Sequence, residues 1–226
     1  MDMPSSKISS AAVRKGMQTR ATILQAALAV ARQQGLEGLT IGVLAQHAGM
    51  SKSGVFAHFG SREELQVAVL REYQTYFVAT VLKPAVQQPR GLARLQQIFT
   101  NWLALALTVP GGCLFLSSAS EYDDRPGPVR EVLVEMIAAW QQELATAVRQ
   151  SIENGDLPVN TDTTQLLFEL YGLVLMSHHQ GRLLGVPDSA TRAQRALQAC
   201  IKRFQSGDIS ITASVVPAVN RQTITK

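Results

Sequence analysis

Apolar residues recur at three- and four-residue spacing along most of the chain, and this spacing predicts α-helices. Near the N-terminus it predicts three short helices, over residues 18–34, 40–48 and 51–59. Gly35 and Gly49 are suited to end the first two, because glycine readily adopts the positive φ of a helix terminus. Three helices of this length can share one small apolar core.

The rest of the chain predicts further helices, separated by breaks that contain glycine and proline. The first starts at Ser61, where Ser61 and Glu64 form a capping box, and it is expected to stop at Pro84. This long helix would join the short helices to the remainder of the chain. The others are expected between residues 91 and 110, over 113–120, over 128–154, from 162 onward and over 189–204.

These elements predict an all-α fold, with an N-terminal three-helix helix-turn-helix domain followed by a helical bundle. The second and third short helices meet in a tight turn at Gly49, and Ser51 caps the third. Its polar start then projects from an apolar base, which suits the major groove of DNA. The expected segments are a flexible basic arm over 1–17, a DNA-binding domain over 18–64, a ligand-binding and dimerisation domain over 65–206 and a disordered tail over 207–226.

The segment LLFELYGLVLM, residues 166–176, is apolar on nearly every face. A helix that is hydrophobic all round must be covered on all sides. In a domain of this size, a second copy of the chain is the expected cover, so the sequence predicts a homodimer.

Composition is that of a globular protein, with 46% apolar and 17% charged residues among 226. No apolar run is long enough to cross a bilayer, and the N-terminal stretch lacks the apolar core of a signal peptide. The two cysteines, Cys113 and Cys200, do not form a disulfide framework. These features favour a reduced, cytoplasmic setting and no membrane partner.

Basic residues are concentrated in the N-terminal quarter of the chain. Residues 1–62 hold seven lysines or arginines and two acidic residues, within a chain of net charge +4. The remainder is therefore nearly neutral. This asymmetry predicts a polyanion such as double-stranded DNA at one end of the molecule and a different partner at the other.

No group of residues has a pattern typical of catalysis, metal binding or a cofactor. Glu121, Asp123 and Asp124 lie in one predicted loop beside an arginine and a proline, which favours a solvated turn. His178 and His179 are neighbours on a helix and point about 100° apart, which suits a shared metal ion poorly. We therefore predict a protein that is not an enzyme.

Two alternatives remain from the sequence. In the first, the chain is an all-helical ligand-binding protein or enzyme subunit whose basic segment binds something other than DNA. In the second, it is a regulator that senses oxidation through the thiol of Cys113, although a cysteine in an apolar segment also suits a core position.

The order of motifs from the first helix to Leu65 resembles the DNA-binding domain of TetR family transcriptional regulators. The resemblance rests on Leu39-Thr40-Ile41, on the run from Gly49 to Phe59 and on Ser61-Arg62-Glu63-Glu64-Leu65. It implies a regulator, most often a repressor, that binds a palindromic operator as a homodimer and is released by a ligand. At Gly42 the family often has a longer polar side chain, so the resemblance implies fewer base contacts here. The residues that it places against DNA are Thr40, Ser51, Lys52, Ser53, Phe56, His58 and Arg62.

Aromatic and methionine residues recur at helical spacing after residue 90, which predicts a bundle with an apolar interior. Pockets between bundle helices bind small molecules of similar character. We therefore expect a small apolar or aromatic effector there. The residues expected at this pocket are Phe99, Trp102, Phe115, Met136, Trp140, Phe168, Tyr171 and Met176.

Overall fold

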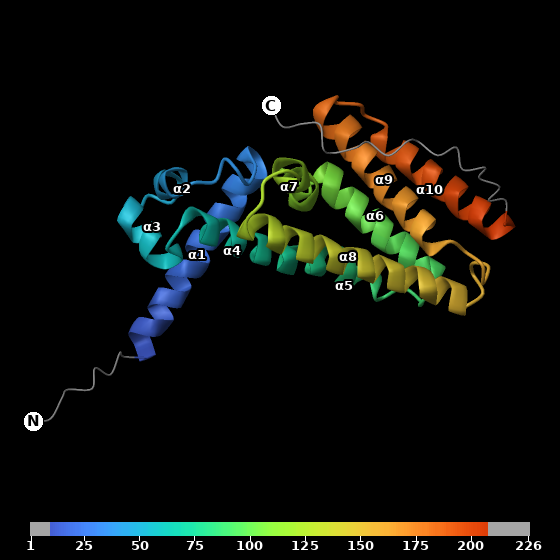
Figure 1. The fold of residues 1–226 in the computed structure, drawn as a ribbon, viewed down its shortest axis with the longest axis horizontal. Helices are drawn as coiled ribbons and strands as arrows, with labels where there is room; N and C mark the ends of the chain where they lie inside the picture. Colours follow the sequence, from blue (N-terminus) through green and yellow to red (C-terminus); the bar gives the residue numbers. More distant parts are fainter. Residues whose placement is uncertain (1–9, 208–226) are drawn as a thin grey trace, which may run out of the picture.

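The computed structural model describes residues 10–207, and every regular element in that range is a helix. Three helices, α1 (Ser10–Gln34), α2 (Ile41–His47) and α3 (Lys52–Phe59), form a small group at one end of the molecule (Figure 1). The remaining helices form a larger bundle at the other end. The predicted all-α fold with a small N-terminal helix-turn-helix unit is confirmed.

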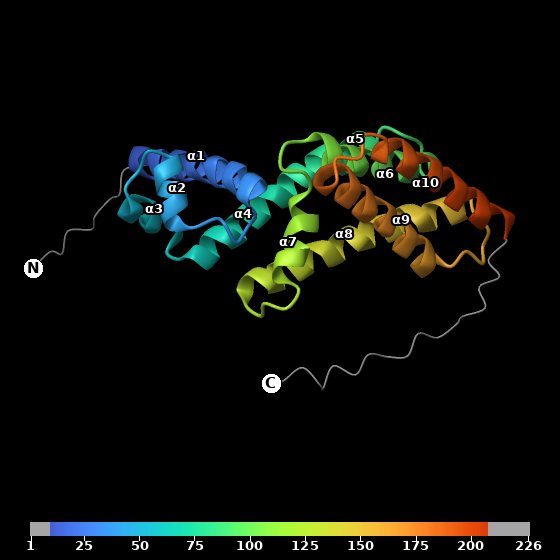
Figure 2. The ribbon, with the colours of Figure 1, turned by 90° about the horizontal axis from the view of Figure 1, so that it is seen from above.

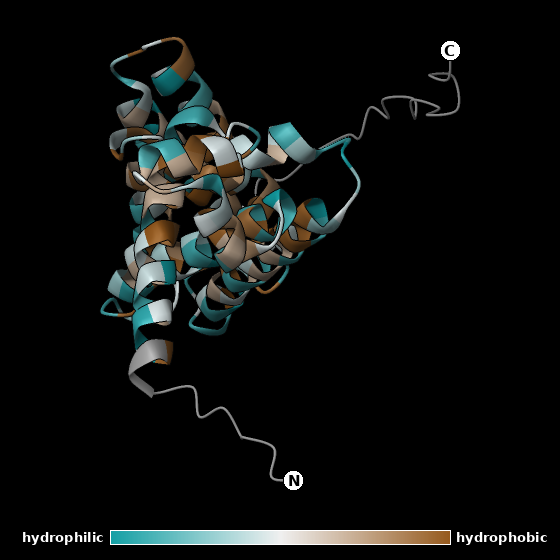
Figure 3. Ribbon diagram, turned by 90° about the vertical axis from the view of Figure 1, so that its left-hand side faces the viewer, coloured by the Kyte–Doolittle hydropathy of each residue, from teal (hydrophilic) through white to brown (hydrophobic). Residues whose placement is uncertain are grey.

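The bundle is joined to the small group by α4 (Arg62–Phe77), which runs from one into the other (Figure 2). Seen along the long axis from the α1–α3 end, hydrophilic and hydrophobic segments alternate on the helices, as expected when each packs one face against its neighbours (Figure 3). The other bundle helices are α6 (Leu92–Thr108), α7 (Leu114–Tyr122), α8 (Pro128–Glu153), α9 (Thr163–His178) and α10 (Ser189–Ser206).

The first helix begins at Ser10, earlier than the predicted start at Gln18. Residues 10–17 contain alanine, arginine, lysine and methionine, which have high helix propensity even without an apolar stripe. The helix therefore extends through part of the segment that we expected to be a flexible arm. Residues 1–9 of that arm, and the tail expected after Gly207, lie outside the described residues.

The caps of the helix-turn-helix form as the sequence predicts. The Thr40 hydroxyl accepts a hydrogen bond from the backbone N–H of Val43 at 3.1 Å, and the Ser51 hydroxyl accepts one from Gly54 at 3.0 Å. Gly49 between them has φ of +63°. These side chains satisfy backbone donors that a helix start leaves free, so they fix where α2 and α3 begin.

The helical run that begins with α4 ends at Ala85, one residue past Pro84 and close to the predicted stop, but it is not α-helical throughout. A π-helical turn, η1 (Val78–Leu82), follows α4 and leads into the short α5 (Lys83–Ala85). A proline ring inside an α-helix clashes with the carbonyl four residues earlier, and the wider π turn relieves that clash. The side chain of Asn101 on α6 also donates a hydrogen bond to the Val81 carbonyl at 2.9 Å.

Aromatic rings fill the centre of the bundle. Phe77 of α4 packs edge-on against Trp140 of α8, with 4.8 Å between ring centres, and Tyr73 packs edge-on against Phe115 of α7 at 4.9 Å. Trp102 of α6 contacts Trp140 at 5.1 Å. The second half of α4 is thereby held in the bundle core.

One face of α9 carries apolar side chains that the described part of the chain leaves exposed. Phe168 is 75% exposed, and Leu175 and Met176 are also exposed. This face follows from a helix that is apolar on nearly every side. None of the described helices is long and apolar enough to span a membrane.

Candidate functional site

The start of α3 presents a polar, positively charged surface. Lys52 and Ser53 are exposed on its first turn, and Val55 and Phe59 bury the opposite face against α1 and α2. The Ser51 hydroxyl lies 3.1 Å from that of Ser53. The structure therefore brings three of the residues predicted to contact DNA to one helix end that points away from the core.

The other predicted DNA contacts surround this end. Phe56 is exposed, whereas Thr40 and His58 are half-buried. The Thr40 hydroxyl is already used as the cap of α2. The guanidinium of Arg20 lies 4.8 Å above the ring of Phe59, so α1 also contributes a cation close to this surface.

The side chain of Lys52 lies close to Gly42. A Cβ atom at position 42 would lie 3.4 Å from Cε and 3.7 Å from Nζ of Lys52, and 3.8 Å from the Thr40 hydroxyl. The ammonium group of Lys52 therefore lies across the start of α2. Gly42 is the position at which the chain departs from the family pattern, and the space beside it holds the ammonium group of Lys52 from the next helix.

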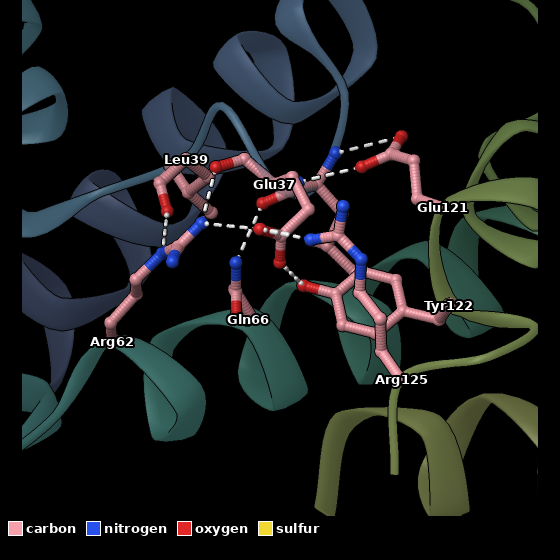
Figure 4. Close-up of polar contacts among 8 residues, drawn as sticks. Glu37, Leu39, Arg62, Gln66, Glu121, Tyr122 and Arg125 are labelled. Carbon is pink, nitrogen blue, oxygen red and sulfur yellow. Dashed lines mark hydrogen bonds and ion pairs between the residues drawn. The ribbon is translucent and has the colours of Figure 1, made fainter. Parts of the chain in front are cut away.

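Arg62, which we expected to face phosphate, instead has several partners within the protein. Its Nε donates to the Leu39 carbonyl at 3.2 Å, and its Nη2 donates to the Glu37 carbonyl and lies 3.2 Å from the Glu37 carboxylate (Figure 4). A phosphate contact by Arg62 would have to compete with these bonds. The geometry gives Arg62 a role in holding α4 to the segment between α1 and α2.

Glu37 is the centre of a cluster that joins the two groups of helices. Besides Arg62, its carboxylate accepts a hydrogen bond from the Tyr122 hydroxyl and lies 2.6 Å from Nη1 of Arg125. The hydrogen bond from Tyr122, followed by the nearby Arg62 and Arg125, lowers the pKa of Glu37. Burial and the same hydrogen bond raise the pKa of Tyr122 well above its usual value.

A second carboxylate strengthens this junction from α7. Glu121 accepts hydrogen bonds from the backbone N–H groups of Leu36 at 3.2 Å and of Glu37 at 2.7 Å. Gln66 of α4 is buried and donates to the Leu36 carbonyl at 2.7 Å. Gly35 has φ of +79°, and a Cβ there would lie 2.7 Å from the Glu121 carboxylate, so only glycine fits this close approach. The turn after α1 is therefore bonded to both α4 and α7.

The sequence predicted a solvated turn at Glu121, Asp123 and Asp124, but Glu121 lies in α7 and its carboxylate is bonded to the turn after α1. Glu37 and Tyr122 are 85 residues apart in the chain. Neither residue belongs to a local sequence pattern that predicts this contact. Only the packing of α7 on the end of α1 brings them together.

A cavity of about 450 Å³ lies in the bundle between α4 with its π-helical extension, α6 and α8. Its walls include the aromatic rings of Phe77, Phe115 and Trp140. Its size is in the range of small-molecule sites. Further lining residues are Gln74, Val78, Leu82, Lys83, Val86, Arg94, Ile98, Met136, Ala139, Glu143, Thr146, Ala147 and Gln150.

The residues expected at an effector pocket are divided among four places. Phe115, Met136 and Trp140 line the cavity, and Phe99 and Trp102 are buried in the core without lining it. Phe168 and Tyr171 border a separate apolar groove between α8 and α9, and Met176 is exposed on α9. Phe168 and Met176 therefore lie away from the cavity, because spacing on an all-apolar helix does not tell which face meets the core.

Cys113 is fully buried, and its burial raises the pKa of the thiol. The thiolate is the form that reacts with oxidants, and it requires a lowered pKa and access. The position of Cys113 therefore suits a core residue and does not favour the thiol-sensor alternative.

Two sequence families match the chain. Residues 23–69 match the family described as bacterial regulatory proteins, tetR family, and residues 91–197 match the tetracyclin repressor-like C-terminal domain. The first match covers the part of the chain from α1 into α4, with the helix-turn-helix between them. The second covers the bundle from the start of α6 into α10.

Individual relatives agree with these matches. The chain is 30% identical over 96 residues to the HTH-type transcriptional repressor AcnR of Corynebacterium efficiens. The aligned residues make up 42% of this chain and 50% of that repressor, so the match spans half of its length. It is 25% identical over 166 residues to the HTH-type transcriptional regulator SrpR of Pseudomonas putida, covering 73% of this chain and 75% of that protein. The fold is similar to a TetR family transcriptional regulator from Cytophaga hutchinsonii, with a TM-score of 0.73 and 22% identity over 84% of this chain and 96% of that one.

Proposed function

Because the chain belongs to the TetR family of transcriptional regulators, we propose that it represses transcription by binding a palindromic operator as a homodimer and is released by a small apolar or aromatic effector. The observation that supports DNA binding best is the exposed, cationic start of α3 on a capped helix-turn-helix. We assign DNA binding to residues 18–64, and ligand binding and dimerisation to residues 65–206. The protein would act in the cytoplasm, where DNA is accessible, and we propose no catalytic role.

In the proposed complex, α3 enters the major groove by its N-terminal end. Lys52 and Ser53 then face base edges and phosphates, because both are exposed on the first turn. Thr40, Ser51, Phe56 and His58 border the same surface and would contact the DNA backbone. With two copies of α3 in a dimer, the two half-sites would be about one helical turn, or a multiple of it, apart.

The uncovered face of α9 supports the homodimer. Phe168, Leu175 and Met176 are exposed apolar side chains on one helix, and an apolar groove between α8 and α9 adjoins them. A second copy would cover the same patch on both chains, as two-fold symmetry requires.

The cavity and the DNA-binding surface are connected through α4. Phe77, at the end of α4, and the π-helical turn that follows it line the cavity. The start of α4 is bonded through Arg62 and Gln66 to the turn after α1. A ligand changes a conformational equilibrium only if it binds one conformation more tightly than the other. An effector that binds more tightly when α4 is in one position would therefore favour that position, and α1, α2 and α3 would move together with α4.

The proposal is tested by footprinting and by fluorescence anisotropy on the DNA that flanks the coding region. We expect a protected palindrome and an affinity that falls steeply with salt, since phosphate contacts release counterions. Random DNA of the same length and base composition is the control. Equal affinity for both DNAs at physiological salt would contradict the proposed sequence-specific binding.

A further inference from the structure

The cavity in the bundle is apolar over most of its wall but carries an excess of positive charge. Its charged lining residues are Lys83, Arg94 and Glu143, with a net charge of +1. Lys83 and Arg94 come from α5 and from the first turn of α6, and Glu143 comes from α8. The cavity therefore combines aromatic walls with two cations from neighbouring helix ends.

Arg94 lacks a negatively charged partner. Its Nη2 donates to the carbonyl of Gln88 at 3.0 Å and to that of Val86 at 3.4 Å, and its Nε donates to Gln88 at 3.3 Å. It forms no ion pair with any residue that the structure describes, whereas Arg90 on the neighbouring turn reaches Glu153 at 3.8 Å. A half-buried guanidinium that bonds only neutral carbonyls has unused capacity for an anion.

The opposite walls of the cavity suit an apolar group. Phe77, Phe115 and Trp140 contribute rings, and the ring centres of Phe77 and Trp140 lie 4.8 Å apart. Met136 and Ile98 add aliphatic surface. A ligand that fills this space buries apolar area, and that burial stabilises the complex.

From these two features we propose that the effector is an amphipathic carboxylate, whose acid group pairs with Arg94 and whose apolar body lies among Phe77, Phe115 and Trp140. This inference rests on the proposed function, since it names the class of ligand for the same cavity. The Nη1 group of Arg94 has no hydrogen bond to a described residue, so it can donate to the carboxylate, and Lys83 adds a second positive charge to the lining of the same cavity. An alcohol of the same shape would leave Arg94 with its present carbonyl partners and lose the charge-assisted bonds.

The test compares acids with uncharged analogues of the same length. Decanoate and phenylbutyrate are titrated against the full-length protein by calorimetry, beside decanol and phenylbutanol. We expect the acids to bind about 10- to 100-fold more tightly, the range that charge-assisted hydrogen bonds give. Arg94→Gln should remove this preference, Arg94→Lys should retain part of it, and Arg90→Gln should leave it unchanged because Arg90 does not line the cavity.

Three results would overturn the inference. They are equal binding of acids and alcohols, no binding of either acid, or an acid preference that persists in Arg94→Gln. Operator binding without any ligand is measured in parallel for each variant. If the wild type binds the operator but shows no acid preference, only the ligand class fails, whereas the loss of specific DNA binding in the wild type itself contradicts the proposed function.

Discussion

Lys52 shows how a single side chain can carry much of the proposed DNA contact. It is exposed at the start of α3 and lies over Gly42, which has no side chain to compete for the same space. We expect Lys52→Ala to weaken operator binding by about 1–3 kcal/mol if the ammonium reads a base. Anisotropy at fixed salt measures the change.

The matched control for this prediction is Lys202→Ala, an exposed lysine on α10 at the far end of the bundle. It should leave operator affinity unaltered. If Lys52→Ala binds as tightly as the wild type at the same salt concentration, Lys52 is not a DNA contact.

Glu37 gives the molecule a stability that depends on pH. The pKa of Glu37 in the folded protein lies below its ordinary value of 4.5. Its contribution to the free energy of unfolding is therefore complete above pH 4.5 and is lost as the pH falls through the pKa of the folded protein. Its side chain is 32% exposed, which limits the contribution to about 1 kcal/mol. We expect Glu37→Gln to lower Tm by about 2–4 °C at pH 7 and by less at acidic pH.

Thermal denaturation, followed by circular dichroism from pH 7 down to acidic pH, checks the prediction. Glu153→Gln is the control, since Glu153 forms only an exposed, 3.8 Å pair with Arg90. A difference between wild type and Glu37→Gln that grows toward acidic pH would have the wrong sign for a carboxylate with a lowered pKa.

At the scale of one helix, α8 offers a way to close the cavity without deleting a core side chain. Ala139 lines the cavity and is exposed, whereas the neighbouring Ala138 is exposed but does not line it. Ala139→Phe should fill part of the cavity and weaken the binding of an anionic aromatic probe by about tenfold or more, through steric exclusion. Fluorescence of anilinonaphthalene sulfonate measures the binding.

Ala138→Phe should bind the probe like the wild type, and both variants should retain operator affinity in the absence of probe. Unchanged probe binding in Ala139→Phe would mean that the probe occupies another site, such as the groove between α8 and α9.

Local sequence signals predicted the helices well because caps and periodicity act within a few residues. Thr40, Ser51, Ser61 and Asp162 each cap the helix that follows, as their positions indicate. The π turn before Pro84 was missed because it depends on tertiary packing, including the hydrogen bond from Asn101 of α6. From the sequence alone, Pro84 predicts the end of a helix and gives no sign of the π turn before it.

The candidate site could be predicted only in part, for the same reason. Lys52 and Ser53 follow from a local motif, and the structure places both on the exposed surface. The partners of Glu37 and the lining of the cavity come from helices far apart in the chain. Arg94 in particular sits in an ordinary amphipathic pattern, and only the fold places it in the lining of a cavity with aromatic walls, where it has no ion-pair partner among the described residues.

For the whole molecule, the proposed dimer depends on the apolar face of α9. Phe168 is its most exposed aromatic residue, and a buried charge without a partner is costly at an interface. We expect Phe168→Glu to weaken dimerisation by about 2 kcal/mol or more and to weaken operator binding with it. Sedimentation velocity at micromolar concentration measures the oligomeric state.

Val159→Glu is the control, because Val159 is almost fully exposed in the turn between α8 and α9. It should sediment like the wild type. A Phe168→Glu protein that remains fully dimeric would show that the two copies meet through another surface.

The path of α4 has a consequence for how the protein unfolds. On one side α4 meets α1, where Gln25 donates a hydrogen bond to Glu72 at 2.6 Å and the guanidinium of Arg32 lies 4.6 Å from the ring centre of Tyr76. On the other side Phe77 packs on Trp140 of α8. One continuous helix therefore packs against both groups of helices, and the buried apolar residues form one cluster that extends from α1 to α10. The chain should lose its structure in one cooperative transition, and residues 18–64 excised without the rest of α4 would lack part of their core.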